Sequence, residues 1–251
     1  MRLTFTVWRQ EGAGDAGRFV DYELDGVGPE FSLLEALDKL NDDLVERGED
    51  PVAFDSDCRE GICGSCGVTV DGRPHGPQAN TPSCRQHLRS FADGARVRLE
   101  PFRSGSYPVV KDLAVDRSNL DRVIEAGGYV SIDGGTAPDA DGHQLSHERA
   151  ETALDMAACI GCGACVAACP NGSANLFTGA KLLQLSVLPT TRQERARRAR
   201  DMVEASEEGF GPCSVFGECA EVCPAGIPLT AIAGVNKEKL RAVLKGRRRD
   251  D

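Results

Sequence analysis

The sequence lacks several features that would place it in common classes of protein. Its longest apolar run is far shorter than the roughly 20 residues that cross a bilayer, so we expect a chain that does not span a membrane by itself. It has no basic excess, and the formal net charge of −10 argues against nucleic acid as a partner. No charged-then-apolar signal segment stands at the N-terminus, so the eleven cysteines are expected in a reducing compartment rather than in disulfides.

Signatures of bond-making chemistry are missing as well. The sequence contains no Gly-rich nucleotide fingerprint and no nucleophile placed with an activating base. Its four histidines all stand outside the cysteine spacings, and we interpret them as surface or structural residues: His75, His87, His143 and His147. The eleven cysteines are therefore the remaining candidates for functional side chains.

What the sequence does contain is a cysteine run of distinctive spacing. Residues 159–170 read C-x2-C-x2-C-x3-C-P, which is the spacing of bacterial ferredoxins. In that pattern three thiolates hold one iron–sulfur cluster and the fourth thiolate belongs to a different cluster. A second cluster is therefore expected close by, held by cysteines from further along the chain.

The second cysteine run repeats the first with one cysteine deleted. It reads C-x5-C-x3-C-P from Cys213, and Phe216 stands where the missing cysteine would be. Exchange of ligands between the two runs predicts a [4Fe–4S] cluster on four thiolates: Cys159, Cys162, Cys165 and Cys223. Three thiolates are left over: Cys169, Cys213 and Cys219. They favour a [3Fe–4S] cluster, and the alternative is a [4Fe–4S] cluster with water or another non-cysteine fourth ligand.

A third cysteine set has the plant-type [2Fe–2S] spacing. A C-x4-C-x2-C loop is followed eighteen residues later by a fourth cysteine: Cys58, Cys63, Cys66 and Cys84. Glycines alternate with these thiols, which suits a loop that needs unusual φ angles and backbone N–H groups near sulfur. Four thiolates could instead form a zinc site, but zinc leaves both C-x3-C-P runs unexplained. The cluster interpretation uses all eleven cysteines.

The periodicities predict an α+β fold. Alternation over residues 2–9 and 20–24 indicates an opening β-hairpin, and Ser32 with Glu35 fits a capping box ahead of a helix. Strand, strand, helix is the start of a β-grasp order, which strands near residues 68–70 and 97–99 would complete. We expect three parts: a β-grasp plant-type [2Fe–2S] ferredoxin-like domain over 1–104, an ordered connector over 105–144, and an α-helical bacterial-ferredoxin-like domain over 145–251.

Helical periods dominate the C-terminal half. One helix is predicted before Cys159, one or two between Leu176 and Glu208, and one from Leu229 to Leu244, with the cysteine runs at turns between them. Residues 237–251 carry seven basic side chains against three acidic ones. We interpret this run as a solvated helix end, and the alternative is a membrane-surface contact through anionic lipids.

Together these motifs resemble the iron–sulfur subunit of succinate dehydrogenases and fumarate reductases. The resemblance covers nearly the whole chain, and residues 107–116 are similar to the connector of that family. It implies a flavoprotein partner with covalent FAD that oxidises succinate, and a membrane anchor that binds quinone on the cytoplasmic side of a bacterial inner membrane. It also implies that electrons enter at the [2Fe–2S] cluster, pass the [4Fe–4S] cluster and leave from the [3Fe–4S] cluster.

Two places depart from the ubiquinone-using members of that family. Residues 171–175 replace a tryptophan-containing segment, and Ser214 replaces a histidine. The resemblance then favours menaquinone and an anchor that is a dihaem cytochrome b. Three alternatives stay open: a fumarate reductase subunit running in reverse, a stand-alone multi-cluster ferredoxin, and a subunit of a thiol:fumarate reductase, whose members tend to carry a further cysteine-rich domain.

Overall fold

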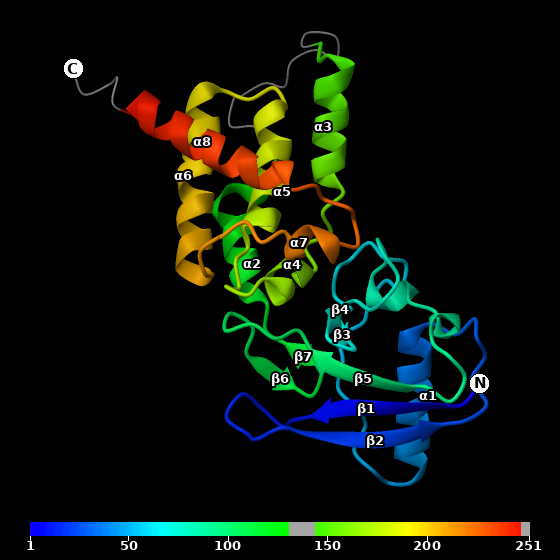
Figure 1. The fold of residues 1–251 in the computed structure, drawn as a ribbon. Coiled ribbons are helices and arrows are strands. Elements are labelled where there is room, and N and C mark those ends of the chain that lie inside the picture. The colour runs from blue at the N-terminus through cyan, green and yellow to red at the C-terminus, as the bar shows by residue number, and fades with distance from the viewer. Residues whose placement is uncertain (131–143, 247–251) are drawn as a thin grey trace. The chain divides into compact units, whose positions relative to one another are not determined.

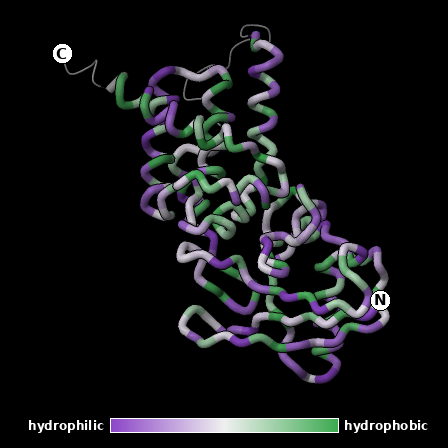
Figure 2. Tube along the Cα trace, in the orientation of Figure 1, coloured by the Kyte–Doolittle hydropathy of each residue, from purple (hydrophilic) through white to green (hydrophobic). Residues whose placement is uncertain are grey.

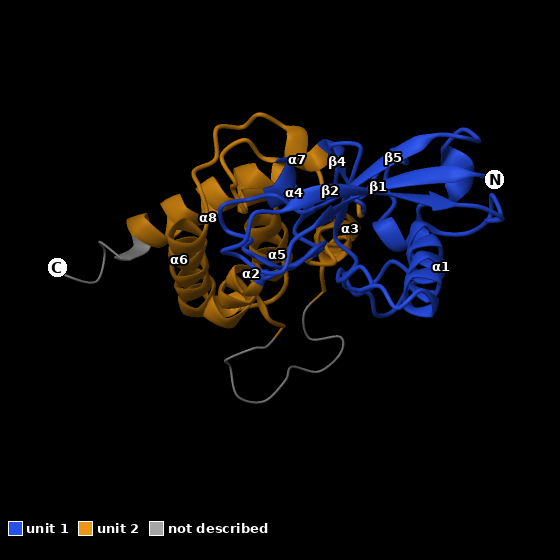
Figure 3. Ribbon diagram, turned by 90° about the horizontal axis from the view of Figure 1, so that it is seen from below, with its two compact units in different colours: residues 1–117, 162–168, 221–224 blue, residues 118–161, 169–220, 225–251 orange. Residues whose placement is uncertain are grey.

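The N-terminal part of the chain folds into a mixed β-sheet (Figure 1). The computed structural model describes residues 1–130 and 144–246. By its internal contacts the chain divides into two units, coloured separately in Figure 3. Unit 1 consists of residues 1–117, 162–168 and 221–224, and unit 2 of residues 118–161, 169–220 and 225–251.

The sheet of unit 1 has five strands in the order β2-β1-β5-β3-β4. β1 and β5 run parallel, and the other neighbours are antiparallel. The predicted opening hairpin and the later strands are thereby confirmed. The strand bounds are β1 Leu3–Arg9, β2 Arg18–Leu24, β3 Val68–Val70, β4 Arg73–Pro74 and β5 Arg96–Pro101.

One helix contributes its apolar face to the core of this sheet. Helix α1, Leu33–Glu46, begins at Ser32, whose hydroxyl accepts the backbone N–H of Glu35 while the Glu35 carboxylate accepts the N–H of Ser32. This reciprocal pair is the predicted capping box. The helix buries leucines at helical spacing against the alternate residues of β1, and Gly48 follows it at φ +69°. Both ends of the predicted helix are confirmed.

The start of the expected connector is part of unit 1. Strands β6, Val109–Lys111, and β7, Ala114–Val115, form a small hairpin around Asp112. The fully buried Asp112 carboxylate accepts the backbone N–H of Ala53 at 2.9 Å and the Nε of Arg9 at 3.1 Å. These bonds fix the hairpin to β1 and to the residues just before the loop that carries Cys58.

The helices lie mainly in unit 2. Those predicted before Cys159, between residues 176 and 208, and over residues 229–244 are confirmed, the middle one as two helices. A helix at 118–123, inside the expected connector, was not predicted. The bounds are α2 Ser118–Val123, a π-helical turn Ile124–Gly128, α3 His147–Ala157, α5 Asn175–Val187, α6 Arg192–Gly209, α7 Glu218–Glu221 and α8 Thr230–Gly246.

Helix α5 is the centre of unit 2 and packs against α3, α6 and α8. Gly179 allows its close approach to α8, because a Cβ there would lie 2.3 Å from the carbonyl oxygen of Ala231. Helix α6 is largely hydrophilic (Figure 2) and joins α8 through Arg195, which donates twice to the buried Glu238 carboxylate at 2.5 and 2.6 Å. A glycine contact therefore joins α5 to α8, and a buried ion pair joins α6 to α8. Cys213 and Cys219 lie in the segment between α6 and α8.

Candidate iron–sulfur centres

The four cysteines of the plant-type set all lie in unit 1. Cys58, Cys63 and Cys66 belong to the loop between α1 and β3, and Cys84 lies on a single 3-10 turn, Ser83–Arg85. The loop bends tightly, with positive φ at Arg59, Gly61 and Gly64. A Cβ on Gly61 would lie 3.2 Å from Pro82, next to the turn that carries Cys84. Glycine thus lets the loop wrap close to the fourth thiol, as the sequence indicated.

Backbone amides point at these sulfurs. The N–H of Glu60 donates to Cys58 at 3.4 Å, and the N–H of Ser65 donates to Cys63 at 3.5 Å. Bonds from the Glu60 and Ile62 amides lower the pKa of Cys58 to about 7. A hydrogen bond with Cys66 lowers the pKa of Cys84 to about 6 and, with burial, raises that of Cys66. Amides that stabilise thiolates fit an anionic iron–sulfur cluster.

His75 is a structural residue of this site that the sequence did not single out among the histidines. It is 1% exposed, and its Nδ1 accepts the backbone N–H of Ser83 at 3.1 Å. The Ser83 hydroxyl lies 2.9 Å from the same nitrogen, and the ring packs edge-on to Phe102. His75 therefore fixes the residue before Cys84. His87 is half-buried, His147 is exposed, and His143 is outside the described residues.

The predicted four-iron set is divided between the two units. Cys162 lies just before the short helix α4, Ala164–Ala168, and Cys165 lies within it. Both belong to unit 1, as does Cys223. Cys159 belongs to unit 2, where its carbonyl accepts the Nζ of Lys181 at 2.8 Å. Gly161 and Gly163 have positive φ, which lets the loop turn between thiols. The run is thus a loop followed by a helical turn, and Cys165 lies within the helix rather than at a bend.

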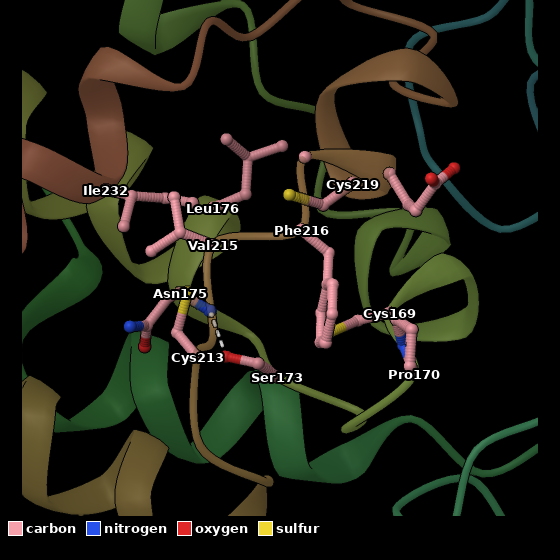
Figure 4. Close-up of a pocket in the computed structure, with 12 residues that line it drawn as sticks. Cys169, Pro170, Ser173, Asn175, Leu176, Cys213, Val215, Phe216, Cys219 and Ile232 are labelled. Atoms are coloured by element: carbon pink, nitrogen blue, oxygen red, sulfur yellow. Dashed lines mark hydrogen bonds between the residues drawn. The ribbon is translucent and has the colours of Figure 1, made fainter.

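The three left-over cysteines share one pocket in unit 2 (Figure 4). Cys169 follows α4, Cys213 lies in the extended segment after α6, and Cys219 lies within α7. Phe216 lines the same pocket and is 60% exposed. Its ring has no donor atom for iron, so the pocket offers three thiols, which fits the three-iron cluster expected from the spacing. Burial, with repulsion from the two neighbouring thiols, raises the pKa of Cys219.

The two positions that depart from the ubiquinone-using pattern contact each other beside this pocket. The Nδ2 of Asn171 donates to the Ser214 hydroxyl at 2.8 Å and to the Pro212 carbonyl at 3.1 Å. A Cβ on Gly211 would lie only 1.8 Å from the Asn171 carbonyl oxygen. The segments that carry Cys169 and Cys213 are therefore joined backbone to backbone, at a place where only glycine fits.

Two family models match the two cysteine-bearing parts of the chain. Residues 4–122 match the family described as "2Fe-2S iron-sulfur cluster binding domain", and residues 155–227 match the "4Fe-4S dicluster domain". The chain is 30% identical to the succinate dehydrogenase iron-sulfur subunit of Bacillus subtilis, over 94% of this chain and 92% of that protein. The chain belongs to the succinate dehydrogenase and fumarate reductase iron–sulfur subunits. The fumarate reductase iron-sulfur subunit of Wolinella succinogenes is 26% identical, over 96% and 98% of the two chains.

The fold also has a counterpart among solved structures. A chain of the "Mycobacterium smegmatis Sdh1 complex in the apo form" aligns with a TM-score of 0.70 and 21% identity, covering 100% of this chain and 98% of that one. At this identity the match supports the fold alone. Within residues 1–130 and 144–246, no helix has both the length and the apolar character to cross a bilayer.

Proposed function

We propose that this chain is the electron-transfer subunit of a succinate:quinone oxidoreductase, with the succinate site on an FAD-containing flavoprotein partner. The observation that carries the proposal is the match to the Bacillus subtilis subunit across 94% of this chain, together with three cysteine sets that account for all eleven cysteines. Bound clusters of these kinds each carry one electron at a time, which links a two-electron flavin to the stepwise reduction of a quinone.

Each cysteine set is assigned to one cluster. The [2Fe–2S] cluster takes the thiols of the glycine-rich loop: Cys58, Cys63, Cys66 and Cys84. The [4Fe–4S] cluster takes the crossed set: Cys159, Cys162, Cys165 and Cys223. The [3Fe–4S] cluster takes the pocket of unit 2: Cys169, Cys213 and Cys219. Amide bonds to sulfur support the first assignment, and a pocket with three thiols and Phe216 supports the third.

The fold supports a finer description of the parts. The five-stranded sheet and the helix α1, which packs on its core, support the classification as a β-grasp ferredoxin. We propose that residues 1–104 form this domain, that 105–144 connect it, and that 145–251 form the bacterial-ferredoxin-like part. The small hairpin at Asp112 and the helix α2 support an ordered connector over the residues described.

The electron exit is proposed to face a membrane anchor that binds quinone. The chain would then lie peripherally on the cytoplasmic side of a bacterial inner membrane. The bonded pair Asn171 and Ser214 stands in place of the residues of ubiquinone-using members, which favours menaquinone and an anchor with two b haems. Haem analysis and quinone assays on the purified complex test this step. A complex without haem that reacts only with ubiquinone would contradict it.

Low-temperature EPR of the air-oxidised complex tests the cluster assignment. Oxidised [3Fe–4S] clusters are paramagnetic, whereas oxidised [2Fe–2S] and [4Fe–4S] clusters are silent. We expect one spin per chain before reduction and two further signals after succinate and then dithionite are added. A silent oxidised sample that contains more iron than one [2Fe–2S] cluster holds would contradict the three-thiol assignment.

A fumarate reductase is the second candidate function. It is favoured by relatives of that name, one of which covers 96% of this chain. The same wiring serves either direction, because the direction follows from the quinone potential and the partner subunits. Succinate oxidation and fumarate reduction rates, measured on one preparation with both quinone types, distinguish the two functions.

A further inference from the structure

One arginine side chain joins the two cluster loops of unit 1. Arg117 follows β7, and its Nη1 donates to the carbonyl oxygens of Gly64 and Cys162, each at 2.7 Å. Its Nη2 donates to the Ser65 carbonyl at 3.0 Å. Gly64 and Ser65 lie between two thiols of the plant-type loop, and Cys162 is itself a thiol of the four-iron set. No spacing in the sequence indicated this role.

The guanidinium is suited to this position in a way that an ammonium is not. Its donors are held in one rigid plane, so a single half-buried side chain can serve three carbonyls in fixed directions. Lysine has one flexible nitrogen and would keep the charge without the fixed geometry. Three charge-assisted bonds therefore define the distance between the two loops.

A second contact supports the four-iron side of this arrangement. Tyr107 is 2% exposed, and its hydroxyl donates to the carbonyl of Gly163 at 3.4 Å. The Arg117 charge also acts on its surroundings: the pKa of His75 is lowered to about 3, mainly by burial and in part by Arg117. The guanidinium thus stands in a partly dehydrated region, where a fixed charge acts over a longer range than in water.

We propose that Arg117 is a positioning residue that sets the spacing of the [2Fe–2S] and [4Fe–4S] clusters and favours the reduced form of both. The inference rests on the proposed function, since it needs clusters at these two cysteine sets. An electron added to either cluster adds negative charge near a permanent cation, which shifts the equilibrium toward reduction. The thiols of the proposed [3Fe–4S] cluster lie in unit 2, outside the two loops to which Arg117 donates.

The test is an EPR-monitored redox titration of the intact complex with Arg117→Gln and Arg117→Lys. Glutamine removes both the positive charge and the rigid plane of N–H donors. We expect the reduction equilibrium constant of the [2Fe–2S] and [4Fe–4S] clusters to fall about tenfold each, which is 59 mV for a one-electron couple. The [3Fe–4S] potential should stay unchanged. Lys should keep both potentials near the wild-type values but alter the magnetic interaction between the two reduced clusters, because their spacing is no longer fixed.

The matched control is Arg47→Gln, which removes an exposed charge of the same unit that pairs with Glu49. It should change neither potential. Wild-type potentials and magnetic interaction in both Arg117 variants would overturn the inference. If Arg117→Gln does not retain clusters, the Lys variant decides by its magnetic interaction alone. A wild-type complex that lacks either cluster signal would instead count against the proposed function, before any variant is compared.

Discussion

The plant-type loop of unit 1 and the three-cysteine pocket of unit 2 differ in how far apart in the sequence their cysteines lie. In the loop, three thiols lie within nine consecutive residues, 58–66, and the fourth follows on a turn fixed by His75. In the pocket, Cys169 is separated from Cys213 by two helices, α5 and α6. One site is thus local in the sequence, and the other depends on the packing of a helical unit.

This difference sets what each site needs in order to form. The loop lies beside a sheet whose core is apolar and whose helix has its own cap, so few distant contacts are required. The pocket requires closure of a long segment before its thiols meet, which costs more chain entropy. We therefore expect substitutions in the packing of unit 2 to affect the pocket strongly and the loop hardly at all.

Gly211→Ala should have the largest effect, because it should disrupt the three-cysteine pocket while leaving the plant-type loop intact. The new Cβ would lie 1.8 Å from the backbone oxygen of Asn171, so the segments of Cys169 and Cys213 must separate. Overpacking of this kind costs about 1–3 kcal/mol or more, here directly beside the pocket. We expect loss of the oxidised [3Fe–4S] EPR signal while the visible circular dichroism of the [2Fe–2S] cluster persists.

The control for this substitution is Gly209→Ala, two residues earlier at the end of α6. Its Cβ would meet Asn119 at 3.4 Å, an ordinary contact, and the signal should be retained. A Gly211→Ala complex with a full three-iron signal would show that the two segments have more room than the structure gives them.

Phe216→Cys should make the pocket resemble a four-thiol site. Position 216 restores the spacing of a complete run and lines the pocket with the other three thiols. We expect a fourth iron to bind, with loss of the paramagnetic oxidised signal and a gain of one iron per chain. Val215→Cys is the matched control, since it adds a thiol one residue out of register. Formation of a four-iron cluster in both variants, or in neither, would contradict the assignment of position 216 as the place of the missing fourth thiol.

The features that could be predicted from sequence are those in which the pattern and the structure are both local. The capping box at Ser32 and Glu35 and the helices of the C-terminal half follow from short-range rules. The cysteine sets could be grouped because cluster geometry fixes the spacing between thiols. The structure brings three of these cysteines together around one pocket: Cys169, Cys213 and Cys219.

The features that could not be predicted depend on contacts between distant residues. Helix α2 is short and polar and has too few residues for a clear period, so its sequence gave no helical signal. Arg117 reaches Gly64 and Cys162, 53 and 45 residues away, and nothing in a single sequence indicates such a pairing. His75 is buried by Phe102 and Ser83 for the same kind of reason.

Glu238→Gln should weaken unit 2 while leaving unit 1 unchanged. Burial disfavours the Glu238 carboxylate, but bonds from Arg195 and the charges of Arg195 and Arg241 outweigh it, so its pKa lies below the usual value. Removing one partner of a buried pair costs about 3 kcal/mol. We expect a lower midpoint of thermal unfolding by far-UV circular dichroism, with earlier loss of the three-iron signal than of the [2Fe–2S] signal.

The pH dependence checks the cause of the Glu238→Gln effect. A carboxylate with a lowered folded-state pKa contributes stability above its unfolded pKa, about 4.3, and loses it as the pH falls through the folded value. The difference between wild type and variant should therefore be complete at pH 7 and shrink in acid. Glu49→Gln, at an exposed surface pair, is the control. A difference that does not depend on pH would mean that packing, and not charge, carries the effect.

Ser32→Ala should have the smallest effect, and this effect should fall on unit 1 rather than on unit 2. It removes the hydroxyl that accepts the Glu35 amide at 3.2 Å, which costs about 1 kcal/mol for a helix cap. We expect a slightly lower unfolding midpoint for unit 1 and full retention of all three cluster signals, because the loop is held by its own amides and by His75. Ser90→Ala, at an exposed turn end, should change nothing. Loss of the [2Fe–2S] cluster in Ser32→Ala would mean that the loop depends on α1, and the local character assigned to this site would be wrong.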